Sequence, residues 1–173
     1  MNIAQEDKNL ATKDKKHIIH PWSDLGSDAE SMIIESGKGI HVFDNEGNQY
    51  IDAISGMWCV NLGHGNKEMA KAISDQCVQL VYYTPFGAMA SPPSIKLAHE
   101  LRQLTPGDLN CFQFTNGGST AVESAIRFVH YYFNCLGQPE KKHILCRENA
   151  APDSTYYAAS VNGQKCDRSD SYD

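Results

Sequence analysis

Short apolar runs alternate with turn-forming residues over the segment from Met32 to Ala53. Its sequence, MIIESGKGIHVFDNEGNQYIDA, contains β-prone stretches separated by SGKG and DNEG, which are rich in the residues of tight turns. Strands joined by such short turns pair with their sequence neighbours in antiparallel order. We therefore predict a small antiparallel meander in this part of the chain.

The pattern changes to a helical spacing after Asn66, which is a good N-cap residue. An amphipathic stripe then recurs at Met69, Ile73, Cys77 and Leu80. A second helix is predicted after Ser91, because Pro92 suits the first turn of a helix. The predicted buried face of this second helix consists of Ile95, Ala98, Leu101 and Leu104, before Pro106 and Gly107 end it.

A strand, a helix and a second strand are predicted between residues 111 and 147. CFQFT (111–115) and HILCR (143–147) are short, largely apolar runs of the kind that form buried strands. The helix between them is predicted to end before Gly137 and Pro139 and to bury Ala121, Ala125, Phe128, Val129 and Tyr132. This order predicts a βαβ unit, so the fold class is α/β, following a mostly antiparallel N-terminal part.

Composition and charge exclude several classes of protein. Hydrophobic residues make up 41% and charged residues 21% of the 173 residues, as in ordinary globular proteins. The net charge of −6 argues against a nucleic-acid partner, because phosphate contacts depend on basic residues. The six cysteines are scattered without a CxxC pair, which argues against a metal site or a disulfide scaffold.

The first 20 residues are polar, and we predict that they form a solvated arm. They contain no apolar signal core, and no other run is long enough to span a membrane. We therefore expect no membrane partner and a cytoplasmic location.

The main candidate for ligand binding is the run NGGST at residues 116–120. Glycines let a ligand approach the backbone, and the first N–H groups of a helix are unpaired donors at the positive end of its dipole. Gly117, Gly118, Ser119 and Thr120 could therefore bind an anion, most often a phosphate. The alternative is a tight turn in which Ser119 caps its own helix. The run matches neither a Walker loop nor a GxGxxG dinucleotide site.

The glycine-rich segment SGMWCVNLGHG (55–65) contains two further candidates. Trp58 could form the wall of a pocket or could be an ordinary buried tryptophan. His64 could be catalytic or could be a structural histidine that closes a turn. Phe86, in YYTPFG, poses the same choice between a pocket and the core.

Four ordered segments together resemble the N-terminal part of class III (omega) aminotransferases. They are IDAISGMWCVNLGHG, the stretch from Tyr82 to Phe86, LTPGDLNCFQFTNGGSTAVESAIRFVHYY and RENAAPDSTYYAAS. These are pyridoxal-phosphate enzymes of fold type I, and the branch that transfers amino groups from omega-amino acids to pyruvate is the most similar in appearance. The resemblance extends from about Trp22 to the end of the chain.

The resemblance implies roles for the candidate residues. Residues 117–119 match the segment that cradles the cofactor phosphate, and Thr120 adjoins it. Trp58 matches an aromatic wall of the substrate pocket. Phe86 matches a residue that reaches the pocket of the neighbouring subunit, so a homodimer is implied.

The resemblance also implies a reaction and a division of the chain. The reaction moves an amino group from an amine or omega-amino acid to a keto acid, with pyruvate as the expected acceptor. The polar arm (1–20) is followed by a segment of the small N-terminal domain (21–90). Residues 91–173 then form the beginning of the cofactor-binding large domain, which is expected to be truncated.

Ala151, Pro152 and Asp153 depart from the family pattern, which has Tyr-His-Gly at these positions. The tyrosine of the family stacks on the pyridine ring, and alanine removes that contact. The aspartate adds a carboxylate near an anionic cofactor. We expect these changes to weaken cofactor binding.

The Schiff-base lysine of the family, and the acid that pairs with the pyridine nitrogen, lie beyond the position of Asp173. We therefore assign no catalytic residue in this chain, and we expect surface positions for Lys141, Lys142 and Lys165. The first hypothesis is an incomplete aminotransferase, without turnover by itself and prone to aggregate. The alternative is a non-catalytic remnant that binds a phosphate ligand or docks onto an intact homologue. A generic phosphate-binding α/β domain is a third interpretation.

Overall fold

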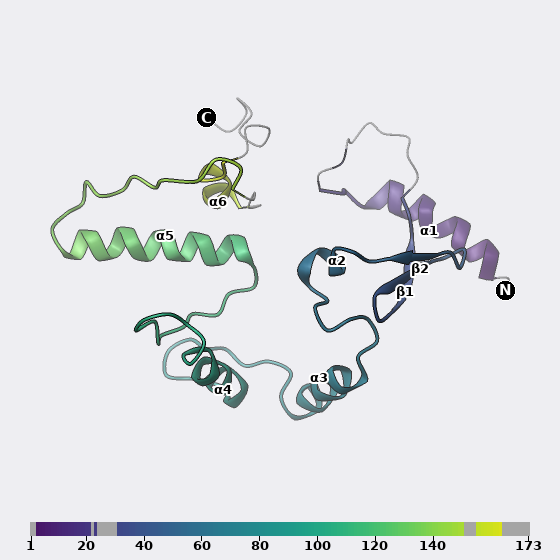
Figure 1. Cartoon of the computed structure of the whole chain (residues 1–173), viewed down its shortest axis with the longest axis horizontal. Helices are drawn as coiled ribbons and strands as arrows, with labels where there is room; N and C mark the ends of the chain where they lie inside the picture. Colours follow the sequence, from purple (N-terminus) through teal and green to yellow (C-terminus); the bar gives the residue numbers. More distant parts are fainter. Residues whose placement is uncertain (1–2, 22, 24–30, 151–154, 164–173) are drawn as a thin grey trace. The chain divides into compact units, whose positions relative to one another are not determined.

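The computed structural model describes residues 3–21, 23, 31–150 and 155–163 (Figure 1). The chain divides into two units, Met1–Met89 and Ala90–Asp173. The elements of the first unit are α1 (Ile3–His17), β1 (Ile34–Lys38), β2 (His41–Asp44), β3 (Gln49–Ile51), α2 (Ser55–Trp58) and α3 (Lys67–Gln79). Those of the second are α4 (Pro92–Leu101), α5 (Gly118–Cys135) and α6 (Tyr156–Ser160). Helices and a sheet together confirm the mixed α/β fold class.

The three strands form the predicted antiparallel meander, in the order β1-β2-β3. The pairing of β1 with β2 ends at Lys38 and His41, and it contains an irregularity between Ile34 and Ser36. The chain reverses directly after Lys38, at Gly39, whose φ of 59° lies in the left-handed region. Glycine adopts this conformation without strain, which explains why SGKG acts as a turn signal.

Asp44 organises the second turn, DNEG. Its Oδ1 atom accepts hydrogen bonds from the backbone N–H groups of Glu46 (2.9 Å) and Asn48 (2.8 Å). Its Oδ2 atom accepts from the Asn48 side chain and from the Tyr50 hydroxyl, both at 2.9 Å. The side-chain bond from Asn48, with support from the other donors, holds the pKa of the Asp44 carboxyl below its ordinary value of 3.8. One carboxylate thus closes the hairpin of β2 and β3.

The polar arm differs from the expected solvated tail because it contains the helix α1. Its sequence, IAQEDKNLATKDKKH, has no glycine or proline and is rich in residues that favour helices. Lys15, Lys16 and His17 lie in the last turn, where cations interact favourably with the helix dipole. Beyond the sequence pattern, Asp14 accepts a hydrogen bond from the Ser31 hydroxyl (2.6 Å), which connects α1 to the segment before β1.

The remaining long helices occur where the sequence predicts them. The Asn66 side chain accepts a hydrogen bond from the backbone N–H of Met69 (2.9 Å) and so caps α3. Ser91 is the N-cap of α4, and Pro92 lies in the first turn of that helix. α5 ends before Gly137, whose φ of 71° turns the chain away from the helix.

The two predicted strands of the βαβ unit are wrong. Residues 111–115 and 143–147 are described by the structure, and neither segment belongs to a strand. A strand depends on hydrogen bonds to a neighbouring strand, and a single extended segment lacks this stabilisation. The apolar content of these segments is typical of strands, but it does not show whether a neighbouring strand is present to pair with them.

The predicted buried face of α5 is also wrong. Phe128 is 59% exposed and Tyr132 is 60% exposed, and Ala121, Ala125 and Val129 are exposed as well. Ile95 of α4 and Leu104, which lies beyond the end of this helix, are likewise exposed. Amphipathic spacing identifies a stripe that can pack, but a packing partner decides whether the stripe is buried.

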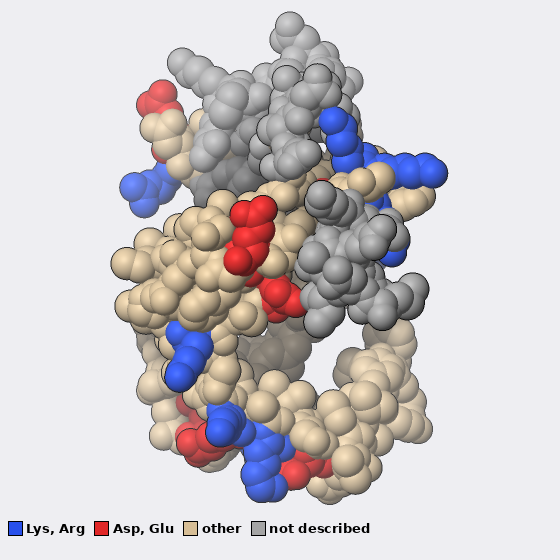
Figure 2. Space-filling view, turned by 90° about the vertical axis from the view of Figure 1, so that its right-hand side faces the viewer, with Lys and Arg blue, Asp and Glu red and all other residues tan. Residues whose placement is uncertain are grey.

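The buried apolar side chains of the described residues are Ile126 of α5 and Ala158 of α6. α6 lies beside α5 in Figure 1, and contacts between the two helices account for this small buried area. The face of the molecule in Figure 2 is mostly neutral, with basic and acidic side chains interspersed. Within the described residues, no helix is long and apolar enough to cross a membrane.

Asp44→Asn is expected to open the DNEG turn, because it removes the negative charge that accepts four hydrogen bonds. The folded-state pKa of Asp44 is lowered, so its stabilisation is present above pH 3.8 and is lost as the pH falls through the lower value. The amide protection factor of Asn48 measures both effects and should fall in each case.

The control is Asp75→Asn on α3, because Asp75 forms only an exposed pair with Lys71. Its substitution should leave the protection of Asn48 unchanged. Full protection of Asn48 in Asp44→Asn would contradict the role given to this carboxylate.

Candidate functional site

The start of α5 contains the residues that the sequence predicts for an anion site. Gly117 is the N-cap residue with an extended backbone (φ −180°, ψ 167°), and the helix begins at Gly118. Among the described residues, no side chain caps this start, and its first turn contains no acidic residue. The first N–H groups of a helix have no acceptor inside the helix, so an external anion can bind there.

Hydroxyl groups around Gly117 fix the shape of the turn. The Thr115 hydroxyl donates to the Gly117 carbonyl (3.0 Å), and the Thr120 hydroxyl lies 2.8 Å from the same carbonyl. The N-cap position belongs to Gly117 rather than to Ser119, which lies inside the first turn. Among the described residues, a Cβ atom at Gly117 would have Thr120 Oγ1, at 4.0 Å, as its neighbour, so a side chain at this position would meet no clash there.

Glu123 connects α5 with α6. Its Oε1 atom accepts a hydrogen bond from the backbone N–H of Tyr157 (3.1 Å), which lies in the first turn of α6. The rings of His130 and Tyr157 meet edge to face, with centroids 6.4 Å apart. The sequence analysis missed Glu123, because its partner lies 34 positions further along the chain.

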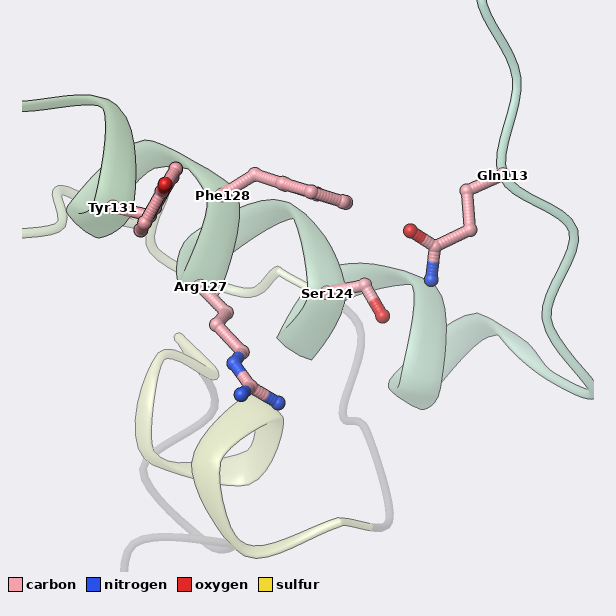
Figure 3. Close-up of a pocket in the computed structure, with 5 residues that line it drawn as sticks. All are labelled: Gln113, Ser124, Arg127, Phe128 and Tyr131. Atoms are coloured by element: carbon pink, nitrogen blue, oxygen red, sulfur yellow. The ribbon is translucent and has the colours of Figure 1, made fainter. Parts of the chain in front are cut away.

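Three pockets formed by described residues lie along α5, and two of them bear on the candidate site. The first, of about 310 Å³, is lined by Gln113, Ser124, Arg127, Phe128 and Tyr131 (Figure 3). In Figure 3 the Gln113 amide points toward α5, and the Arg127 guanidinium extends toward α6. This pocket contains none of the ligand-binding residues predicted from the sequence, although Phe128 was predicted as a core residue.

The second pocket, of about 490 Å³, includes one predicted residue, Thr120. The other lining residues are Glu123, Ser124, Arg127, His130 and Tyr157. Polar and charged groups therefore dominate the side of α5 that faces α6, close to the start of the helix.

Trp58 lies in a strained turn. Ser55, Gly56, Met57 and Trp58 have φ values of 49°, 56°, 60° and 66°, which place all four in the left-handed region. Three of the four carry side chains, and for such residues this conformation costs roughly 1–2 kcal/mol each. Trp58 is 73% exposed, so the interpretation as an ordinary buried tryptophan is wrong. The turn presents the indole at the surface of its unit.

Asp52 and His64 hold this turn. The Asp52 Oδ2 atom accepts a hydrogen bond from the backbone N–H of Gly56 (2.9 Å) and lies 2.8 Å from His64 Nε2. The bond from His64, followed by the bond from Gly56, lowers the pKa of the Asp52 carboxyl below its ordinary value. The geometry supports the structural interpretation of His64. The sequence analysis did not identify Asp52, because a pair twelve positions apart has no helical or strand spacing.

Phe86 lies in an exposed loop. Its backbone N–H donates to the Thr84 hydroxyl (3.2 Å), and Gly87 follows with a φ of 68°. Phe86 is 80% exposed, so the core interpretation is wrong. The ring is available for contact with another part of a protein or with a second subunit.

The predicted residues fall into both units of the chain. Trp58 and Phe86 belong to Met1–Met89, whereas residues 117–120 belong to Ala90–Asp173. Ala151, Pro152 and Asp153 lie outside the described residues, as does Lys165.

Lys141 and Lys142 are exposed, as predicted. The Lys141 ammonium lies 4.5 Å from the centroid of the Phe133 ring, a cation–π contact at the surface. The described part of the chain contains no group of three His, Cys, Asp or Glu residues that could hold a metal ion.

The chain is similar in sequence and structure to known aminotransferases. The profile of the family Aminotransferase class-III matches residues 23–171. Putrescine–pyruvate aminotransferase of Pseudomonas aeruginosa is 34% identical over 153 residues, which cover 87% of this chain and 34% of that protein.

Two solved structures are similar to the chain at a TM-score of 0.88 each, and each match covers 92% of this chain and 36% of the other. One is the omega transaminase from Pseudomonas jessenii in complex with PMP, which is 35% identical. The other is a thermostable omega transaminase variant, W58G, engineered for asymmetric synthesis of enantiopure bulky amines, which is 36% identical. The chain spans about a third of the length of these relatives.

Ser119→Asp is expected to weaken the binding of a simple phosphate ester such as phenyl phosphate by at least about tenfold. A carboxylate in the first turn of α5 would repel the anion and compete for the backbone N–H groups. Isothermal titration calorimetry on the purified chain measures the change.

The control is Ser91→Asp, which adds the same charge at the N-cap of α4, a helix that begins with Pro92 and has no glycine at its start. This variant should bind the ester as the wild type does. Equal affinity in Ser119→Asp and the wild type would show that the start of α5 holds no anion.

Proposed function

The chain belongs to the class-III aminotransferase family, and we propose that it contributes the phosphate-binding turn and part of the substrate pocket for amino transfer from an amine or omega-amino acid to pyruvate. The family uses pyridoxal phosphate and acts on amines and keto acids. The observation that carries the proposal is the glycine-rich start of α5 inside the matched region, which no side chain of the described residues caps.

The residues at the start of α5 fit the phosphate group of this cofactor. Gly117 and Gly118 are exposed, so the phosphate can approach the backbone, and Ser119 and Thr120 follow in the first turn. A dianion at this position gains about 0.3–1 kcal/mol from the helix dipole, in addition to its hydrogen bonds. When bound, the cofactor supplies an electron sink for the reacting carbon. The task of residues 117–120 is to hold its phosphate end in one place.

Trp58 and Phe86 are the residues of this chain that we assign to the substrate pocket. The W58G variant described for bulky amines replaces a tryptophan with the same number as Trp58. This supports a role of Trp58 in limiting the size of the amine. Phe86 is exposed on a loop, which suits a residue that reaches the pocket of a second subunit in a homodimer.

The keto-acid acceptor is proposed from the name of one relative, and the cellular location is proposed from the cysteines. The relative from Pseudomonas aeruginosa is named for pyruvate, which supports pyruvate as the acceptor. Five cysteines of the described residues are exposed, which suits a reducing compartment such as the cytoplasm.

The 173-residue chain is proposed to bind the cofactor phosphate without catalysing amino transfer by itself. Amino transfer requires a lysine amine that binds the cofactor and moves a proton at the substrate carbon. Lys141 and Lys142 are exposed surface residues, and Lys141 is engaged with Phe133. Neither is assigned this task.

Purified chain is expected to bind pyridoxal phosphate more tightly than pyridoxal, because only the former carries the anion that the start of α5 accepts. Equilibrium dialysis with each compound measures the difference, which should be at least about threefold. Equal affinity for the two compounds would show that the chain has no phosphate site, and it would contradict the proposed function.

The same preparation should produce no alanine from pyruvate and putrescine, as measured by chromatography. Borohydride treatment followed by peptide mass spectrometry should find no single lysine that is stoichiometrically modified. Alanine production, or full modification at one lysine, would show instead that the chain is active by itself.

Restoring the family pattern, with Ala151→Tyr, Pro152→His and Asp153→Gly together, is expected to strengthen binding of pyridoxal phosphate. The added ring contact is worth about 0.5–1.5 kcal/mol, which corresponds to roughly a 2- to 12-fold gain in affinity. Asp153→Gly alone separates the effect of charge from that of stacking. An unchanged affinity in the triple variant would mean that these positions do not contact the cofactor.

A further inference from the structure

We propose that Asp52 and His64 form a positioning pair, which sets where the indole of Trp58 lies by holding the left-handed turn at residues 55–58. Neither side chain needs to touch a substrate for this task. The use of Trp58 as a pocket wall rests on the proposed function, whereas the hold on the turn rests on the geometry of this unit.

His64 is held against the sheet by contacts that do not involve Asp52. The backbones of His64 and Gly39 exchange two hydrogen bonds of 2.9 Å each. The imidazole ring lies against Gly37 in β1, where a Cβ atom would be only 2.6 Å from His64 Cγ. A side chain at position 37 would displace the ring, so glycine leaves the space that the ring occupies.

Asp52 connects the fixed imidazole of His64 to the backbone of the turn. Its backbone N–H donates to the Ile40 carbonyl (2.9 Å), which anchors Asp52 next to the reversal between β1 and β2. Its Oδ2 atom accepts from both His64 Nε2 and the Gly56 N–H, so one oxygen joins the imidazole to the backbone of the turn. A carboxylate can only accept, so His64 carries a hydrogen on Nε2 in this bond. The two side chains are 9% and 23% exposed, which shields the bonds from water.

The position of the indole depends on the backbone of this turn. Trp58 is 73% exposed, so packing of its own ring contributes little to its order. Its backbone N–H donates to the Ile54 carbonyl (2.8 Å), inside the strained segment. Without the Asp52 acceptor, Ser55, Met57 and Trp58 would relax toward the conformations that residues with side chains favour.

Hydrogen exchange of the ¹⁵N-labelled chain tests the pair. His64→Leu removes the N–H donor and keeps an apolar side chain over Gly37, whereas His64→Gln keeps an N–H donor. Exchange at the Gly56 and Trp58 amides should rise at least about tenfold in His64→Leu and stay within about threefold of the wild type in His64→Gln. His41→Leu removes a histidine from the same sheet and should change neither amide.

The Asn48 amide is the internal reference, because it donates to the carboxylate of Asp44 in the same sheet. If amide exchange at Asn48 also rises in His64→Leu, this substitution has opened the sheet itself. The variant Asp52→Asn then tests the turn separately. That variant leaves the His64 ring on Gly37 and weakens only the acceptor.

Faster exchange at Gly56 with an unchanged Asn48, in either variant, supports the positioning pair. Unchanged exchange at Gly56 overturns it, as do equal effects of His64→Leu and His64→Gln. The proposal is also overturned if amide exchange at Asn48 rises in both His64→Leu and Asp52→Asn, because the pair would then stabilise the whole sheet rather than the turn.

Fluorescence gives a direct measurement on the indole. The chain has two tryptophans, so Trp22→Phe leaves Trp58 as the sole emitter. The amplitude of fast indole rotation, from time-resolved anisotropy, should increase when His64→Leu is added and should not increase with His64→Gln or His41→Leu. An unchanged amplitude in His64→Leu would overturn the proposal.

Neither measurement needs cofactor or turnover, so its result is independent of the proposed function. If the turn loosens as expected and Trp58 nevertheless proves irrelevant to amine size in an active relative, only the pocket role of Trp58 fails. The positioning pair and the assignment of the pocket are therefore tested separately.

Discussion

Three carboxylates accept hydrogen bonds from backbone N–H groups at turns and at a helix start of this chain. Asp44 closes the hairpin of β2 and β3, Asp52 holds the left-handed turn, and Glu123 meets the first turn of α6. Because the described residues bury few apolar side chains, these short bonds have a large part in fixing the loops. The positions of Trp58 and of the contact between α5 and α6 both depend on them.

No carboxylate and no other side chain of the described residues caps the start of α5. The start of α4 also lacks a side-chain cap, so the feature that distinguishes α5 is the pair Gly117 and Gly118. An internal acid at this place would compete with a phosphate for the same N–H groups. Gly117, which precedes the helix, and Gly118, its first residue, are exposed, and Thr115 and Thr120 shape the turn from the side. Carboxylates thus hold the turns at Asp44, Asp52 and Glu123, whereas the start of α5 is the place that we propose for an external anion.

Local signals in the sequence predicted the meander, the caps of α3 and α4, and the extent of α5, because each depends on residues close together in the chain. Long-range pairing was beyond these signals. Residues 111–115 and 143–147 have the composition of strands but no strand partner, and the stripe of Phe128 and Tyr132 has no packing partner in the described part of the chain. For the site, the run 117–120 was recognisable, whereas Asp52 and Glu123 act on partners 12 and 34 positions away.

Backbone conformation restricts which residues can replace Trp58. Its φ of 66° suits glycine, which has no Cβ atom to clash, and is unfavourable for β-branched side chains. Glycine at this position would remove the indole and relax the backbone in one step, whereas valine, although also smaller than tryptophan, would add strain. The space beside the turn can thus be enlarged more readily by the smallest residue than by one of intermediate size. The order in which position 58 tolerates smaller residues therefore depends on backbone conformation as well as on side-chain volume.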